Sequence, residues 1–325
     1  MHPAFSVIFL TTLIGAGQGL FLAMYTGQLY SLANVLPAQS DRFYAAGSLI
    51  ALALLMAGLG ASFFHLGRPE RAWRAAAMWR TSWLSREVIV LPVTMALVFA
   101  YGLAHWAGWT RPLIVLGGSI PLDPTLILGF LGTLATFALF VCTAMVYASI
   151  RFLQEWHSPL TALNFTFLGL ASGFMLAAAY SAYLDNRLVA FFGIWAVIAT
   201  AIAWFGRLAA LSRNARLTCK STIQTAIGVR HRALTQKAQG ATGGSFNTRE
   251  FFHGHSEATV RAVRTLFPIL VFPLPILLIG ASYILESQTL PITAFGIQYL
   301  GLLAERWSFF TEARHPQNLY YQSVA

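Results

Sequence analysis

Long apolar runs separated by short polar segments dominate the sequence. Runs of about 20 apolar residues recur along the whole chain, and this is the length that an α-helix needs to cross a bilayer. The segments of about ten residues with alternating polarity that mark a membrane β-barrel are not seen. The pattern therefore predicts an all-α integral membrane protein, a single domain over residues 1–325 with a bundle of eight transmembrane helices. The predicted spans are residues 4–36, 42–64, 87–106, 125–150, 160–183, 187–211, 265–285 and 290–310.

Small residues within two spans predict a close helix contact. Gly15 and Gly19 lie four residues apart in the first span, and Gly169 and Gly173 repeat this spacing in the fifth. Such small-xxx-small pairs let neighbouring helices approach closely.

Prolines predict where helices bend. Pro268, Pro273 and Pro275 fall in the seventh span and predict a kink there, because proline removes a backbone hydrogen bond. Pro92 is expected in the first turn or two of the third span, where the lost bond matters least.

A polar stretch between the second and third spans, residues 63–87, has the sequence FFHLGRPERAWRAAAMWRTSWLSRE. It joins two spans, so it must lie at a membrane surface. It contains one histidine, five arginines, three tryptophans and two glutamates. His65 ends one apolar run and Glu87 is expected to begin the next, so both should lie where the bilayer meets water.

Composition and charge predict the orientation. Hydrophobic residues make up 57% of the chain and charged residues 10%, and the net charge is +10. Eight spans would place 18 of the 21 Lys and Arg residues on one face, including those of a basic loop at about 212–264. Because Lys and Arg near helix ends stay in the cytoplasm, both termini and that face should be cytoplasmic in a bacterial inner membrane. The net positive charge is therefore explained by the orientation of the protein in the membrane and not by nucleic-acid binding.

Cysteine and histidine usage limits the possible redox groups. The two cysteines, Cys142 and Cys219, cannot supply a four-cysteine iron–sulfur cluster, so any clusters should belong to a partner. No two histidines are expected at matching depth on facing helices, so no haem is predicted. His253 and His255 could be read as metal ligands, but a solvated loop accounts for them, and no metal is predicted.

His65 and Glu87 have the chemistry of a quinone site. A quinone needs hydrogen-bond donors at its carbonyl oxygens and a route for two protons. Histidine titrates near neutrality, and a desolvated glutamate can pass protons onward. The alternative is an ordinary interfacial histidine and a glutamate favoured by the helix dipole.

Three further residues are candidates for quinone binding: Arg68 in the polar stretch, Gln18 in the first span and Asn164 in the fifth. Gln18 is more often an interhelical hydrogen-bonding residue than a ligand, and Asn164 lies one turn into the fifth span. The arginines between positions 68 and 86 could set topology, bind anionic lipid headgroups or dock a protein partner, and the sequence does not choose among these roles.

At His65-Leu-Gly-Arg-Pro69, with Glu87 after it and Trp156-His-Ser-Pro-Leu-Thr161 before the fifth span, the chain resembles the anchor subunits of dimethyl sulfoxide reductase type. The resemblance covers the whole chain. It implies an anchor that binds ubiquinone or menaquinone at His65 and Glu87. It also implies two partners, a four-cluster iron–sulfur subunit and a molybdopterin catalytic subunit.

The predicted orientation departs from that of the dimethyl sulfoxide reductase, whose catalytic module is periplasmic. A cytoplasmic face resembles the anchors of cytoplasmically oriented, membrane-bound sulfite dehydrogenases. The resemblance thus implies the quinone-reacting subunit of a sulfite-oxidising complex, with no molybdenum site of its own. The alternatives are an anchor for a quinol-oxidising dimethyl sulfoxide or polysulfide reductase, and an anion transporter that uses the arginine-rich face.

Overall fold

The computed structural model describes residues 1–116, 120–184, 188–218, 220–238 and 246–321. Long α-helices account for most of these residues: α1 (Phe5–Leu32), α2 (Asp41–Ser62), α3 (Trp83–Trp106), α4 (Pro124–Ala148), α5 (Pro159–Tyr183), α6 (Val189–Ala215), α9 (Glu257–Val271), α10 (Pro273–Ile284) and α11 (Thr289–Glu312). The shorter elements are η1 (Phe63–His65), η2 (Pro69–Met78), β1 (Ile114–Leu116), β2 (Ile120–Leu122), α7 (Ile223–Ile227), α8 (Phe246–Glu250) and η3 (Pro316–Tyr320).

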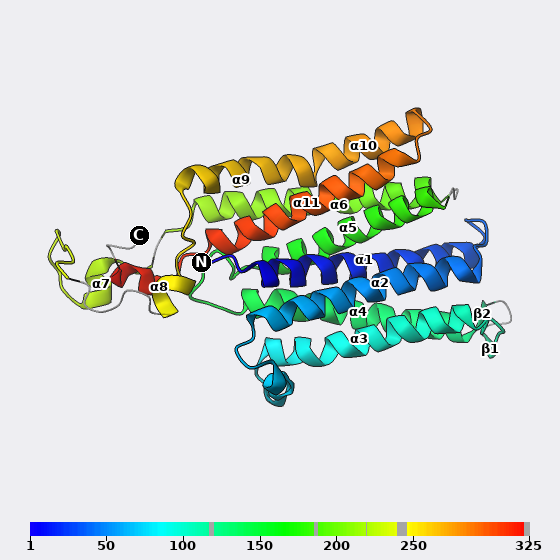
Figure 1. Ribbon diagram of the computed structural model, residues 1–325, viewed down its shortest axis with the longest axis horizontal. Helices are drawn as coiled ribbons and strands as arrows, with labels where there is room; N and C mark the ends of the chain where they lie inside the picture. Colours follow the sequence, from blue (N-terminus) through cyan, green and yellow to red (C-terminus); the bar gives the residue numbers. More distant parts are fainter. Residues whose placement is uncertain (117–119, 185–187, 219, 239–245, 322–325) are drawn as a thin grey trace.

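The long helices lie side by side and form one bundle (Figure 1). Met1 lies at one end of the bundle, together with the segment between α2 and α3, α7, α8 and η3. We call this the basic end, because the predicted Lys- and Arg-rich segments gather there. The C-terminal ends of α1, α3, α5 and α10 and the N-terminal ends of α2, α4, α6 and α11 lie at the opposite end.

Seven helical stretches of the described chain are long and apolar enough to cross a membrane. They are α1 to α6 and the combined stretch of α9 and α10, with α2 extended to His65. The eighth predicted span is present as α11, which packs against α5, α9 and α10. Its sequence includes Gln298, Glu305, Arg306 and Glu312, and these polar residues keep it out of the apolar set. The predicted count of eight is therefore not confirmed.

The third helix begins earlier than the sequence pattern predicts. α3 starts at Trp83, because the Ser82 side chain accepts a hydrogen bond from the backbone N–H of Ser85 and caps the first turn. Glu87 therefore lies in the second turn and does not begin the helix. For the same reason Pro92 lies inside the helix, so its expected place in the first turn or two was wrong.

The predicted kink in the seventh span is confirmed. α9 ends at Val271 and α10 begins at Pro273, with Phe272 between them at φ −110° and ψ −79°. Pro273 and Pro275 cannot donate backbone hydrogen bonds, so the helix cannot continue unbroken through this point. The span also begins earlier than predicted, at Glu257, where the Ser256 side chain caps the helix.

The two glycine pairs face one another across the α1–α5 contact. A Cβ built on Gly19 would lie 2.2 Å from the carbonyl oxygen of Gly169. A Cβ on Gly173 would lie 2.0 Å from the carbonyl carbon of Gly19. Only glycine permits this backbone approach, and the prediction of a close helix contact is confirmed.

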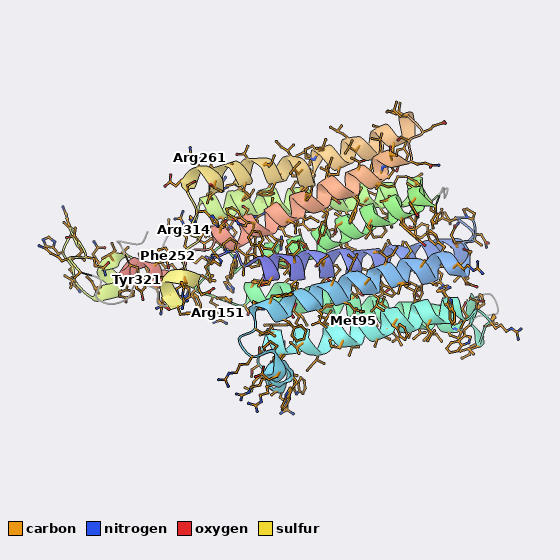
Figure 2. The ribbon with its side chains drawn as sticks, viewed as in Figure 1. Met95, Arg151, Phe252, Arg261, Arg314 and Tyr321 are labelled. Atoms are coloured by element: carbon orange, nitrogen blue, oxygen red, sulfur yellow. The ribbon has the colours of Figure 1, made fainter. Side chains whose placement is uncertain are left out.

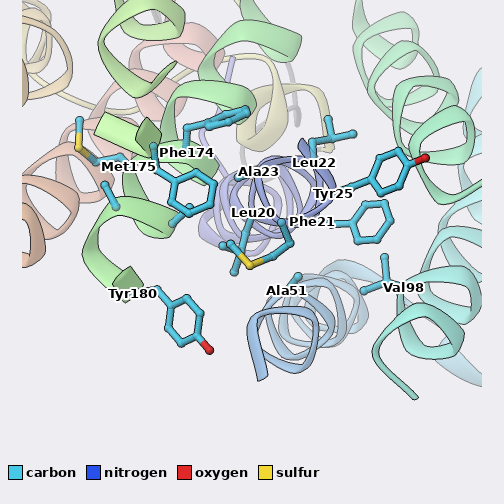
Figure 3. Packing of buried hydrophobic residues seen from close by; sticks show 14 of the residues in the cluster. Leu20, Phe21, Leu22, Ala23, Tyr25, Ala51, Val98, Phe174, Met175 and Tyr180 are labelled. Atoms are coloured by element: carbon cyan, nitrogen blue, oxygen red, sulfur yellow. The ribbon is translucent and has the colours of Figure 1, made fainter. Parts of the chain in front are cut away.

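Around this contact lies the apolar core of the bundle (Figure 3). Leu20, Phe21 and Met24 on α1 are fully buried, as is Val98 on α3. The ring of Phe21 meets the edge of Tyr101 with ring centroids 5.4 Å apart. α1 is thus the central helix, in contact with α2, α4, α5 and α11.

Two features lie outside the predicted helices. β1 and β2 pair antiparallel at the opposite end, a small hairpin that the apolar pattern did not predict. At the basic end, residues 216–238, 246–256 and 313–321 form what we call the cap. It extends beyond the helix ends along the long axis of the molecule (Figure 1). Part of the basic loop predicted at about 212–264, residues 219 and 239–245, lies outside the described residues.

Candidate functional site

His65 lies at the basic end, in the 3-10 turn that extends α2. The turn closes when the backbone N–H of Leu66 donates to the carbonyl of Phe63, and Pro69 then starts η2. His65 is exposed. Among the described residues, no hydrogen bond, ion pair or ring contact engages its imidazole. Both ring nitrogens are therefore available to a ligand.

Glu87 is buried in the second turn of α3, with 8% of its surface exposed. Its Oε1 accepts a hydrogen bond of 2.6 Å from the Oγ1 hydroxyl of Thr143 on α4. A buried carboxylate is unfavourable unless it is hydrogen-bonded or protonated. A glutamate held in this way is a candidate proton carrier, because a carboxyl group can take up a proton from one neighbour and release it to another.

The two residues lie on neighbouring helices at the same end of the molecule. α2 and α3 are in contact, and η2 packs against α3. The hydrogen bond of Glu87 is directed toward α4, however, and no hydrogen bond or ion pair joins it to His65 in the described part of the chain. A ligand that touches both would thus bridge a surface-exposed donor and a buried carboxylate.

Arg68 follows His65 and is exposed. It lies just before η2, with φ −142° and ψ 80°. Its guanidinium has no partner among the described residues. The exposed side chain of Arg68 would therefore have to move along the protein surface to reach a ligand held at His65.

Gln18 and Asn164 lie deeper in the bundle. The Nε2 of Gln18 donates to the carbonyl of Thr136 at 3.1 Å, so Gln18 links α1 to α4 as the interhelical alternative expected. Asn164 is 4% exposed, and its Oδ1 has no hydrogen-bond partner in the described structure. This oxygen faces α6, 2.7 Å from where a Cβ on Gly206 would be.

The segment from residue 63 to residue 82, which we call the strap, presents arginines stacked on tryptophans. Arg74 lies 5.5 Å from the ring centroid of Trp73, and Arg80 lies 5.4 Å from that of Trp79. The side chains of the strap project sideways from the foot of α3 (Figure 2).

A buried charge cluster at the basic end was not predicted from the sequence. Glu305 on α11 has no exposed surface, and Arg207 on α6 and Arg306 are 3% and 4% exposed. The Nε of Arg207 lies 2.9 Å from Oε1 of Glu305, and its Nη2 lies 3.4 Å from Glu312. Arg306 also pairs with Glu305. The sequence signal for this cluster was the adjacent Glu305 and Arg306 inside a predicted membrane span.

A second polar network, also not predicted, lies at the opposite end. Asp41 and Nδ1 of His105 are 3.0 Å apart, and His105 is 2% exposed with its Nε2 unpartnered among the described residues. Tyr101 donates to Gln28 at 2.9 Å, and Gln28 donates to Thr125 at 2.6 Å. The sequence signal was weak, since these residues come from four different helix ends.

Metal ligation finds no support in the described residues. They contain no group of three or more His, Cys, Asp or Glu side chains that could hold a metal ion. His253 and His255 lie with ring centroids 6.4 Å apart in the cap, without a third ligand beside them.

Comparisons with known proteins agree on a family. The profile of the family described as "DMSO reductase anchor subunit (DmsC)" matches residues 1–306. The chain is also 72% identical to a sulfite dehydrogenase subunit from Allochromatium vinosum over 325 residues, which is 100% of both chains. The expected resemblance to anchor subunits of this type is thus confirmed over nearly the whole chain.

Proposed function

The chain belongs to the DMSO reductase anchor subunit (DmsC) family, and from this premise we propose that it is the quinone-binding membrane anchor of a sulfite-oxidising complex. In this proposal the chain spans the bacterial inner membrane eight times, with α11 as the eighth span and the basic end in the cytoplasm. An iron–sulfur subunit and a molybdopterin subunit dock at that end. The relative named as part of a sulfite dehydrogenase supports sulfite as the electron donor.

The observation that carries the proposal is the pairing of a free imidazole with a buried glutamate at one end of adjacent helices. A bound quinone supplies the two-electron chemistry and takes up two protons as it becomes quinol. The residues fit such a group, because His65 has an unengaged N–H donor for a carbonyl oxygen and Glu87 is a buried titratable carboxyl.

The chain's own residues would then act on protons and not on electrons. His65 donates a hydrogen bond to one carbonyl oxygen and orients the ring at the membrane surface. Glu87 holds or releases a proton at its carboxyl, while the Thr143 hydroxyl steadies Oε1 at 2.6 Å. The two electrons would come from sulfite, which would gain an oxygen atom from water to become sulfate and release two protons, and the partner's clusters would supply the electron path.

The test replaces each residue in the assembled complex. His65→Ala and Glu87→Gln should each lower the rate of sulfite-dependent quinone reduction by about 100-fold or more, the contribution expected of a positioned proton-transfer group. Sulfite oxidation with an artificial acceptor should be unchanged, because that reaction bypasses the quinone.

Matched controls come from the same end of the molecule. Glu70→Gln removes an exposed carboxylate that pairs with Arg71 at 3.8 Å, and His231→Ala removes an exposed cap histidine. Both should leave quinone reduction intact. Normal quinone turnover in the His65 and Glu87 variants would refute the site.

A further inference from the structure

A cavity of about 1120 Å³ lies between the cap and the basic end of the bundle. Its walls come from the start of the chain, the α4–α5 connection, the end of α6, the start of α9, the end of α11 and the cap. Pockets for small molecules usually measure about 300–1,000 Å³. This cavity therefore exceeds what a single inorganic anion would fill, and its size suits a peptide segment.

The lining is strongly positive. Lys220, Arg249, Arg264 and Arg314 line the cavity and are exposed. None of them forms a salt bridge in the part of the chain that the structure describes. Four histidines lie there too: His2, His253, His255 and His315.

The carboxylates in the lining are already engaged. Glu312 pairs with Arg207 at 3.4 Å and accepts a hydrogen bond from Asn214 at 3.3 Å. Glu155 accepts a hydrogen bond from the backbone N–H of Arg314 at 3.5 Å. Among the described residues, none of the four cations forms an ion pair with Glu155 or Glu312. A negatively charged occupant would therefore find four cationic side chains to pair with.

Contacts within the cap, and between the cap and the start of the chain, shape the cavity before anything binds. Asn318 donates to the carbonyl of Phe251 at 2.9 Å, and the ring of His315 stacks on Phe251 with centroids 3.6 Å apart. The backbone N–H of His2 donates to the carbonyl of Glu250 at 2.9 Å. A preformed cavity lowers the entropic cost of binding.

Its place in the molecule favours a protein occupant over lipid. The cap extends along the axis of the bundle (Figure 1), which is the direction away from a membrane plane. Arg314 lies where the cap meets the end of α11 (Figure 2). The strap, by contrast, projects sideways at the level of the helix ends, where lipid headgroups lie.

We propose that this cavity is the socket for an acidic segment of a soluble partner subunit. The inference rests on the proposed function, since it assumes a complex with partners at the basic end. Arginine side chains pair with carboxylates through two parallel hydrogen bonds, and arginine is enriched at protein interfaces. The socket would therefore receive glutamates or aspartates from the partner and fix its register on the anchor.

The experiment compares two charge reversals in the complete complex, expressed with its partners and purified in mild detergent. The socket variant carries Arg249→Glu, Arg264→Glu and Arg314→Glu. The matched strap variant carries Arg71→Glu, Arg74→Glu and Arg80→Glu. We expect the amount of partner that copurifies per anchor to fall by about tenfold or more in the socket variant. The introduced glutamates would repel the acidic segment of the partner, and like charges at an interface are unfavourable. The strap variant and an Arg→Lys socket variant should retain the partners. Retention of the partners by the Arg→Glu socket variant would overturn the proposal.

A second measurement does not depend on folding of a variant complex. Purified wild-type anchor should bind a fluorescein-labelled octaglutamate peptide, and high salt should weaken the binding because it screens the charges. Partners that stay bound while this peptide fails to bind would also overturn the socket. Failure of the proposed function would look different from failure of the socket. If only the proposed function were wrong, the wild-type complex would keep its partners at the socket but would not reduce quinone.

Discussion

Glu305 pairs with two arginines inside the bundle, and the stability of the fold should depend strongly on this one carboxylate. Glu305 has no exposed surface and pairs with Arg207 and Arg306. Removing one member of a buried ion pair leaves an uncompensated charge, which is more costly than never having buried the pair.

Glu305→Gln should therefore lower the free energy of unfolding by about 3–5 kcal/mol. The measurement is the midpoint of thermal unfolding of the purified chain in detergent. Glu257→Gln is the control, because its ion pair with Arg261 has side chains 94% and 79% exposed and such pairs contribute little. Equal midpoints for the two variants would show that the buried cluster does not stabilise the bundle.

For single residues, the sequence indicated which polar side chains were candidates for function, but it did not indicate which side chains they contact. Glu87 could be selected because a carboxylate beside an apolar run is unusual. Its hydrogen bond to Thr143 could not be predicted, since that residue lies on a different helix and no local pattern links the two. Arg207 and Glu305 escaped notice for the same reason, as their pairing depends on how α6 and α11 pack.

The α1–α5 contact is the clearest case at the scale of elements. Four glycines at small-xxx-small spacing predicted a close approach, and the structure shows the two pairs meeting. The kink near Phe272 followed in the same way from prolines. Such local signals were reliable because each depends on backbone geometry alone. The start of α3 was misplaced because the Ser82 cap lets the helix begin at Trp83, before the uninterrupted apolar run that follows Glu87.

Gly19→Ala should separate α1 from α5 and lower the thermal midpoint, because its Cβ would lie 2.2 Å from a backbone oxygen that cannot move aside. Gly60→Ala is the control, since a Cβ there meets nothing within 4 Å. Alanine at a helix interior is favoured over glycine by about 0.5–1 kcal/mol, so this control should keep or raise the midpoint. A Gly19→Ala protein as stable as the wild type would contradict the contact.

The cap should loosen as pH falls. Burial lowers the pKa of His253 and of His315 below the usual 6.5. Each Nδ1 accepts a backbone N–H, from His255 at 3.1 Å and from Gln317 at 3.2 Å, so protonation at Nδ1 would end these bonds. As pH falls, these histidines bind protons at a higher pH in the unfolded cap than in the folded cap. Their contribution to the stability of the folded cap is therefore complete above about pH 6.5 and declines as pH falls below that value.

Hydrogen–deuterium exchange, corrected for the intrinsic rate, would show this as falling protection of residues 246–256 and 316–321 in acid. His315→Asn should reduce the pH dependence at η3, because asparagine can accept the same N–H without titrating. Protection that does not change between about pH 7.5 and pH 5.5, on either side of the usual histidine pKa, would rule out the histidines as the cause.

Orientation is a property of the whole molecule, and it decides between the candidate complexes. The fold gathers at one end the segments that hold 18 of the 21 Lys and Arg residues, so the basic end should face the cytoplasm. The test uses single cysteines in a background of Cys142→Ala and Cys219→Ser. In right-side-out spheroplasts, a membrane-impermeant maleimide should label Arg111→Cys, at the opposite end, and should label Arg230→Cys in the cap only after lysis. The reverse pattern would place His65 and Glu87 at the periplasmic surface. A cytoplasmic source of sulfite electrons could not then reach them, and a quinol-oxidising reductase anchor would become the better assignment.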